Sequence, residues 1–288
     1  MHDPDDRFRR RAALRLMVFV SLISAWTAVF AAQTVTLPPV DELTRQAGTT
    51  PQRITVVEPH ESTRDHLTPV DYLALPINPL LDRWFGEAWK APDSELVFVA
   101  EDGYRSAIPG SRLQAKRALL AHARADGAPF AVDNPSQHEK GIRLGPYYLI
   151  WDNRADAELI ERGAYGWPYQ VVRVELRTSA DDRALLPASP TAESRQALAD
   201  VKEYCLSCHR INGQGGEKYP EDLLQATCRW NRGAFEEWID DPARVRPGTR
   251  MPPLDRMLPA AKRSEVIDRL ADYLWTLARE SGRCASGR

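Results

Sequence analysis

The first half of the chain alternates apolar runs with turn residues, a pattern that predicts β-strands. Residues 96–100 (LVFVA) are apolar throughout, Asp102-Gly103 follows as a turn, and residues 104–108 alternate between polar and apolar positions. This succession indicates a β-hairpin. Branched and aromatic side chains predict further strands at residues 53–57, 147–151 and 169–176.

Apolar residues recur at helical spacing in several other segments. Residues 80–89 predict one short helix, and residues 111–125, with leucines among alanine, lysine and arginine, predict a longer one. Ser189-Pro190 has the composition of a helix start, and the apolar positions after it continue to Tyr204 at an amphipathic spacing. The same spacing predicts a last helix over residues 264–280.

These elements predict a multi-domain fold in which an α+β domain precedes an all-α domain. The α+β domain is expected over residues 33–177, and residues 178–189, which have no periodicity, are expected to be a linker. The all-α domain is expected over residues 190–288. The chain contains no internal repeat or low-complexity segment that would change this division.

Residues 1–32 have the pattern of an export signal or an N-terminal membrane anchor. Five arginines precede residue 16, and residues 16–32 then run without a charge. Val29 and Ala31 make cleavage after Ala31 plausible, whereas seventeen uncharged residues also reach the lower length limit of a bilayer span. Either outcome predicts a protein that is periplasmic, or that faces the periplasm while anchored to the inner membrane.

The charge balance gives no reason to expect a nucleic-acid partner. The 288 residues include 38 lysines and arginines against 40 aspartates and glutamates, for a formal net charge of −2. Because 43% of the residues are hydrophobic, the chain can bury a substantial core. Selectivity for a partner must therefore come from a local site.

The strongest chemical signal is Cys205-Leu206-Ser207-Cys208-His209, a C-x-x-C-H sequence. At this spacing two thiols can form thioether bonds with the vinyl groups of a haem while the histidine reaches the iron. The rival interpretation is a zinc site made from all four cysteines of the chain, but Cys228 and Cys284 do not form a second close pair. In an exported protein these two are expected to form a disulfide, with two free thiols as the alternative.

The residues after this sequence resemble those of class I cytochromes c, which carry a single haem. Asn212-Gly213-Gln214-Gly215-Gly216 follows after two residues, and Gly248-Thr249-Arg250-Met251-Pro252-Pro253 lies further along the chain. The resemblance covers residues 190–281. It implies one haem c held by thioether bonds to Cys205 and Cys208, with His209 and Met251 as axial iron ligands. It also implies a haem pocket that includes Trp238 and Pro220, although Tyr219 precedes this proline where the family usually has glycine.

The position of Met251 supports its assignment as a ligand independently of the family. Two of the four methionines lie in the leader, and only Met251 of the other two is followed by a proline pair that keeps its loop out of a helix. Met257 is interpreted as a core residue. A histidine ligand is the alternative, and the candidates before the cysteines are His60, His66, His122 and His138. Methionine and histidine together leave no open iron position, which favours electron transfer over oxygen binding.

Residues 95–175 weakly resemble the molybdopterin-binding fold of sulfite oxidase-type enzymes, through stretches such as VAEDGYR at 99–105 and WPYQVVRVE at 167–175. That family holds its metal through a cysteine, and no cysteine precedes Cys205. The resemblance therefore implies a scaffold without molybdenum that docks a partner or covers the haem. Polar candidates exist, but Asp102 fits a turn and His122 a helix face, so no catalytic residue is predicted.

We expect an exported c-type cytochrome that transfers single electrons between periplasmic or membrane-bound redox proteins, an electron carrier rather than an enzyme. The alternative is a fused enzyme in which the N-terminal domain oxidises a small molecule and passes the electrons to the haem. A haem-based sensor is a third interpretation. The sequence identifies neither the electron donor nor the acceptor.

Overall fold

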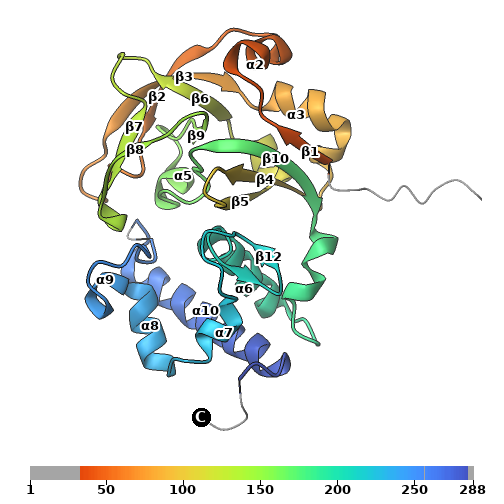
Figure 1. The fold of residues 1–288 in the computed structure, drawn as a ribbon, viewed down its shortest axis with the longest axis vertical. Helices are drawn as coiled ribbons and strands as arrows, with labels where there is room; N and C mark the ends of the chain where they lie inside the picture. The colour runs from red at the N-terminus through yellow and green to blue at the C-terminus, as the bar shows by residue number, and fades with distance from the viewer. Residues whose placement is uncertain (1–32, 256, 285–288) are drawn as a thin grey trace, which may run out of the picture. The chain divides into compact units, whose positions relative to one another are not determined.

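The computed structural model describes residues 33–255 and 257–284 (Figure 1). The predicted export signal or anchor at residues 1–32 lies outside the described residues. All described residues belong to one compact unit. Within the described part of the chain, no helix combines the length and the apolar character needed to cross a bilayer.

The first sheet has four antiparallel strands in the order β1, β10, β4, β5, which are Gln33–Thr36, Val171–Thr178, Ser94–Ala100 and Arg105–Pro109. The predicted hairpin is confirmed, because β4 pairs with β5 across the Asp102-Gly103 turn. Every residue of β4 is buried: the apolar run at residues 96–100 and also Ser94 and Glu95, which precede it. The strand expected over residues 169–176 is present as β10.

The second sheet is also antiparallel, with the order β2, β3, β6, β9, which are Gln52–Val57, Pro69–Pro76, Ala118–Arg124 and Tyr148–Trp151. The predicted strands at 53–57 and 147–151 are confirmed, but the predicted helix over 111–125 is wrong. Helix α4 covers only Gly110–Ala115, and β6 follows it. Residues 118–121 are all buried between β3 and β9, and this pairing outweighs the helix propensity of alanine and leucine.

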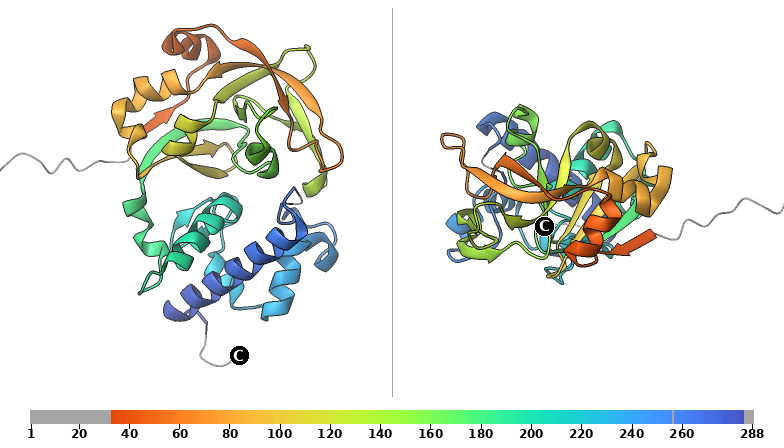
Figure 2. Two further views of the ribbon diagram at one scale, coloured as in Figure 1. Left: turned by 180° about the vertical axis from the view of Figure 1, so that it is seen from behind. Right: turned by 90° about the horizontal axis from the view of Figure 1, so that it is seen from above.

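Short helices and one small hairpin complete the sheet-containing part of the molecule. Helices α2 and α3 pack against each other, as the two views in Figure 2 show. The helix predicted over 80–89 is present as α3 followed by a 3₁₀ turn, η1. These elements and the remaining ones are α2 (Val40–Ala47), α3 (Asn78–Phe85), η1 (Gly86–Lys90), β7 (Ala131–Asn134), η2 (Pro135–Gln137), β8 (Glu139–Arg143) and α5 (Ala157–Glu161).

The chain continues through η3 into a mostly helical part. Its first helix, α6, starts after Thr191, whose side chain accepts a hydrogen bond from the backbone N–H of Ser194, so the cap lies two residues beyond Ser189. The longest helix, α10, contains the predicted segment 264–280 and contacts α6, α7 and α8. The elements are η3 (Ser179–Leu185), α6 (Ala192–Tyr204), β11 (Arg210–Ile211), β12 (Gln214–Gly215), α7 (Leu223–Thr227), α8 (Arg232–Asp240), α9 (Pro242–Val245) and α10 (Ala260–Glu280).

The predicted fold class, an α+β domain followed by an all-α cytochrome c domain, is wrong. The segment after the cysteines contains the antiparallel pair β11 and β12, which turns at Asn212-Gly213 with positive φ at both residues. The helical part also shares hydrogen bonds with the sheets. The backbone N–H of Arg105 donates to the Ser207 carbonyl at 2.8 Å, and that of Glu217 donates to the Gly103 carbonyl at 2.9 Å. The result is a mixed α and β unit.

A partly buried lysine strengthens this connection. Nζ of Lys202 in α6 lies 2.7 Å from a carboxylate oxygen of Glu95 in β4 and 2.7 Å from one of Asp182 in η3. Both carboxylates are buried. Removing only the lysine would leave two buried charges without their common partner, so this contact holds α6 against the first sheet.

Candidate functional site

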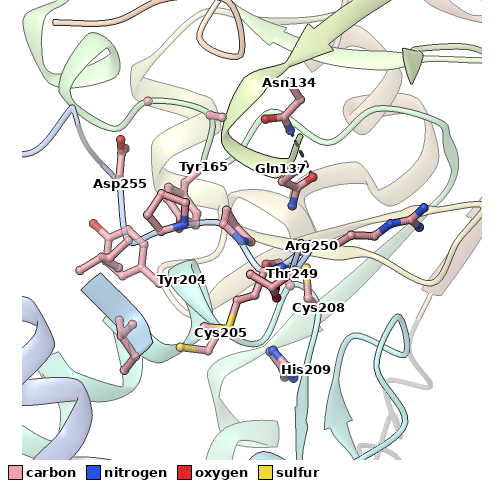
Figure 3. Close-up of a pocket in the computed structure, with 18 of the residues that line it drawn as sticks. Asn134, Gln137, Tyr165, Tyr204, Cys205, Cys208, His209, Thr249, Arg250 and Asp255 are labelled. Atoms are coloured by element: carbon pink, nitrogen blue, oxygen red, sulfur yellow. Dashed lines mark hydrogen bonds between the residues drawn. The ribbon is translucent and has the colours of Figure 1, made fainter. Parts of the chain in front are cut away.

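The cysteines lie on a helical turn that continues α6. Cys205 is the C-terminal cap of this helix, and the backbone N–H groups of Cys208 and His209 donate to the Cys205 carbonyl at 3.2 and 2.9 Å. The turn brings Cys205, Cys208 and His209 to one side of a common cavity (Figure 3). The local sequence is therefore sufficient to place two thiols and one imidazole together.

Both thiols are free, and burial keeps them protonated. Burial raises the pKa of Cys205 to about 12 and also raises the pKa of Cys208. A zinc site would need thiolates, and the cysteines that could complete it are joined in the Cys228–Cys284 disulfide. The four-cysteine zinc interpretation is therefore wrong, and the expected disulfide is present.

Two glycines allow the chain to fold back closely under this turn. The backbone N–H of Gly216 donates to the carbonyls of Leu206 and His209 at 2.7 and 2.9 Å. A Cβ atom at Gly216 would lie 2.2 Å from the Ser207 carbonyl oxygen, and one at Gly215 would lie 2.3 Å from that of His209. Larger residues at these positions would displace the cysteine-bearing turn.

The imidazole of His209 is suited to binding a metal ion. Burial lowers its pKa, so the ring is neutral and has a lone pair to offer. The ring of Tyr219 stacks on it with centroids 5.1 Å apart and an interplanar angle of 23°. Because the backbone N–H of Tyr219 donates to the Cys208 carbonyl at 3.2 Å, this ring is tied to the same turn.

The cavity has a volume of about 1380 Å³. Typical pockets for small ligands have volumes of roughly 300–1,000 Å³, so there is room for a group larger than an ordinary metabolite. One wall comes from the helical part and the other from the sheet part, including residues 59–65, Tyr104, Asn134 and Gln137. Figure 3 shows Asn134 and Gln137 across from the cysteines. Two free thiols, a neutral imidazole and a large cavity fit a covalently attached haem.

The cavity brings together most of the predicted haem-pocket residues. Met251 lines it from the loop between α9 and α10, where its backbone N–H donates to Thr249 Oγ1 at 3.2 Å. Trp238 lines it from α8 and stacks on Trp230 with centroids 5.4 Å apart. Met257, which was expected to be a core residue, also lines the cavity. Two thioether side chains therefore line the same cavity as Cys205 and Cys208.

The structure does not bring Pro220 to this cavity. Of the described residues, its neighbours Tyr219 and Glu221 are lining residues and Pro220 is not. Its carbonyl oxygen accepts a hydrogen bond from Arg210 at 2.5 Å rather than from His209. The side chain that supports His209 is the stacked Tyr219, the residue that departs from the family pattern.

Several lining residues had no local sequence signal. Asp255 is one of them: burial raises the pKa of its carboxyl to about 6, and its Oδ2 atom has no hydrogen-bond partner among the described residues. His60 is another, and it is the only one of the four alternative histidines that lines the cavity within the described part of the chain. His122, predicted on a helix face, lies in strand β6 instead.

Comparison with protein-family models, curated proteins and solved structures finds no match to this chain in any of the three. The functional argument therefore depends on the residues of the site.

Proposed function

We propose that this protein binds one haem c covalently and transfers single electrons. Cys205 and Cys208 would form the thioether bonds, and His209 would be an axial ligand of the iron. The observation that carries the proposal is the position of two free thiols and a neutral imidazole on one turn at the wall of a large cavity. When bound, the haem supplies an iron that alternates between the ferric and ferrous states.

Covalent attachment has a direct test. The denatured protein should keep its haem stain on a gel, and acid-acetone extraction should leave the haem on the chain, because thioether bonds survive both treatments. The Cys205→Ala/Cys208→Ala variant should contain no covalent haem. The Cys228→Ser/Cys284→Ser variant is the matched control, since it also removes two cysteines but should keep the haem. Complete extraction of haem from the wild-type protein would contradict the proposal.

For the second axial ligand we propose Met251. A methionine ligand produces a weak sulfur-to-iron absorption band in the far red and raises the reduction potential relative to two histidines. The Met251→Ala variant should lose this band, whereas Met257→Ala should keep it. Because both side chains line the cavity, the opposite result would assign the ligand to Met257.

We further propose that the protein works in the periplasm, free or anchored to the inner membrane through residues 16–32, and that its partners are periplasmic or membrane-bound redox proteins. The arginine-rich, then uncharged, sequence of the leader supports this location. Fractionation of cells that express the full chain would test it. Recovery of the haem protein in the cytoplasm would contradict it.

One observation also favours the second candidate, an enzyme that oxidises a small molecule and transfers the electrons to the haem. The sheet part contributes a titratable cluster, Glu58 and His60, to the region of the same cavity. A small molecule bound between the two walls would lie next to both a proton acceptor and the haem.

A further inference from the structure

A carboxylate is fully buried in the sheet part, beside the cavity. Glu58 has no exposed surface, and its two oxygens accept hydrogen bonds from Tyr72 Oη at 2.7 Å, Tyr148 Oη at 2.9 Å and His60 Nδ1 at 2.8 Å. Its pKa is lowered in spite of burial, because the hydrogen bonds from His60 and Tyr72 offset the desolvation. The carboxylate is therefore ionised and rigidly held.

The backbone and the neighbouring rings also fix this cluster. Asn153 uses its side-chain amide to pair with both backbone groups of Val57, accepting from N–H at 2.9 Å and donating to the carbonyl at 2.8 Å. Glu58 follows directly, at the end of β2. The rings of Tyr72 and Tyr148 pack edge to face with centroids 5.7 Å apart. The position of Glu58 is thus set by β2, β3 and β9 together.

His60 connects the buried carboxylate with the cavity. Its side chain is only 5% exposed, and it is one of the residues that line the cavity. Both side-chain contacts of the ring meet Nδ1, which lies 2.8 Å from Glu58 Oε1 and 3.1 Å from Tyr148 Oη, so Nε2 is the ring nitrogen left to accept a proton. A histidine whose Nδ1–H is held by a carboxylate is a proton acceptor at the other nitrogen.

The surroundings of His60 are aromatic. Tyr169 lies edge-on to the imidazole with centroids 5.6 Å apart, and Trp167 lies 5.9 Å from Tyr148. Tyr169 and Trp167 both line the cavity. Aromatic walls with one placed polar group favour an aromatic ligand whose own polar group meets that point. A phenolic hydroxyl has this chemistry, because its O–H can donate to Nε2.

We propose that the cavity binds a small phenolic electron donor between the two walls, with His60 as the catalytic proton acceptor and Glu58 as its positioning residue. This inference rests on the proposed haem. As the O–H bond of the donor breaks, Nε2 of His60 would take the proton; a bound ferric haem would supply the acceptor for the single electron. The donor leaves as a neutral radical, so charge and atoms balance.

The first test measures how fast hydroquinone reduces the ferric protein. The His60→Gln variant should be slower by about a hundredfold or more, the usual contribution of a positioned general base. Reduction by ferrocyanide, which involves no proton, should not change. His66→Gln is the matched control, since this exposed histidine lies in the same loop but is not among the cavity-lining residues. The wild-type reaction with hydroquinone, but not with ferrocyanide, should be slower in deuterated water.

The second test measures binding without electron transfer. Phenol binding to the ferric protein, followed by calorimetry, should weaken about tenfold in His60→Gln, as expected for the loss of one buried hydrogen bond. The Glu58→Gln variant should bind phenol with nearly wild-type affinity and yet react slowly with hydroquinone, because the ring remains but loses the carboxylate that orients it and balances the positive charge formed when Nε2 takes the proton. If Glu58 only supported the fold, the Glu58→Gln variant would lose phenol affinity and hydroquinone reactivity together.

The results distinguish this inference from the proposed function. A protein without covalent haem would refute the proposed function itself. If haem is present, equal rates of hydroquinone reduction in wild-type and His60→Gln protein would refute the inference alone. A change in the far-red sulfur-to-iron band in His60→Gln would also refute it, because His60 would then belong to the iron site.

Discussion

The Cys228–Cys284 disulfide closes the segment that carries Met251 and Trp238. Cys228 caps the end of α7, Cys284 follows α10, and the two are 56 positions apart in the chain. Replacing both by serine would release this loop in the unfolded protein. The chain-entropy relation for a loop of this length predicts that the free energy of unfolding falls by about 4 kcal/mol at 25 °C.

Urea unfolding of the haem-loaded protein would measure this loss. The midpoint should move to lower urea in the Cys228→Ser/Cys284→Ser variant, and the slope of the free energy with urea should rise slightly, because the unfolded chain becomes less compact. Dithiothreitol should produce the same shift in the wild-type protein, since it reduces the disulfide and leaves thioether bonds intact. The serine variant should not respond to it.

A loss smaller than about 1 kcal/mol would refute the loop-closure reasoning. It would mean that other contacts already constrain the unfolded chain between α7 and α10. Alternatively, strain from the disulfide would cost the folded protein a free energy comparable with the loop-closure gain. A loss of haem attachment in the serine variant would contradict the assignment of the thioether bonds to the other two cysteines.

Three further predictions concern the site and its supports. Burial raises the pKa of the Asp255 carboxyl from its ordinary 3.8 to about 6, so its full contribution to folding stability is present below pH 3.8 and is lost as the pH rises through 6. Asp255→Asn removes the buried charge and should therefore increase the free energy of unfolding in urea above pH 6 by up to about 3 kcal/mol. Gly216→Ala should destabilise the protein by about 1–3 kcal/mol and lower the yield of haem-loaded protein, because the new Cβ atom would lie 2.2 Å from the Ser207 carbonyl oxygen. Gly233→Ala is the control and should be at least as stable as the wild type, because its Cβ atom would meet Asn231 Oδ1 only at 3.9 Å. Lys202→Met should cost about 3–5 kcal/mol of unfolding free energy, since it leaves two buried carboxylates without their cation.

Some local features could be predicted because their signals lie between near neighbours. The Asp102-Gly103 turn predicted the β4–β5 hairpin correctly, and the spacing of Cys205, Cys208 and His209 was sufficient to place them on one turn. The Asn212-Gly213 turn carries the same kind of signal. It was available in the sequence and would have argued against an all-α fold for this segment.

Tertiary structure decided the features that depend on distant pairing. Residues 118–121 form a strand because β3 and β9 flank them on both sides, although their composition favours a helix. Met257 lines the cavity because of the path of its loop, which periodicity does not describe.

The contrast is clearest in the site itself. The sequence alone determined the thiols and the imidazole of the C-x-x-C-H turn, since backbone hydrogen bonds over four residues position them. Only the tertiary structure placed Glu58 against Tyr72 and Tyr148, up to 90 positions away, and placed His60 in the same cavity as Cys205. A buried carboxylate needs several donors, and in this fold they come from different strands, so that no local pattern in the chain predicts the cluster.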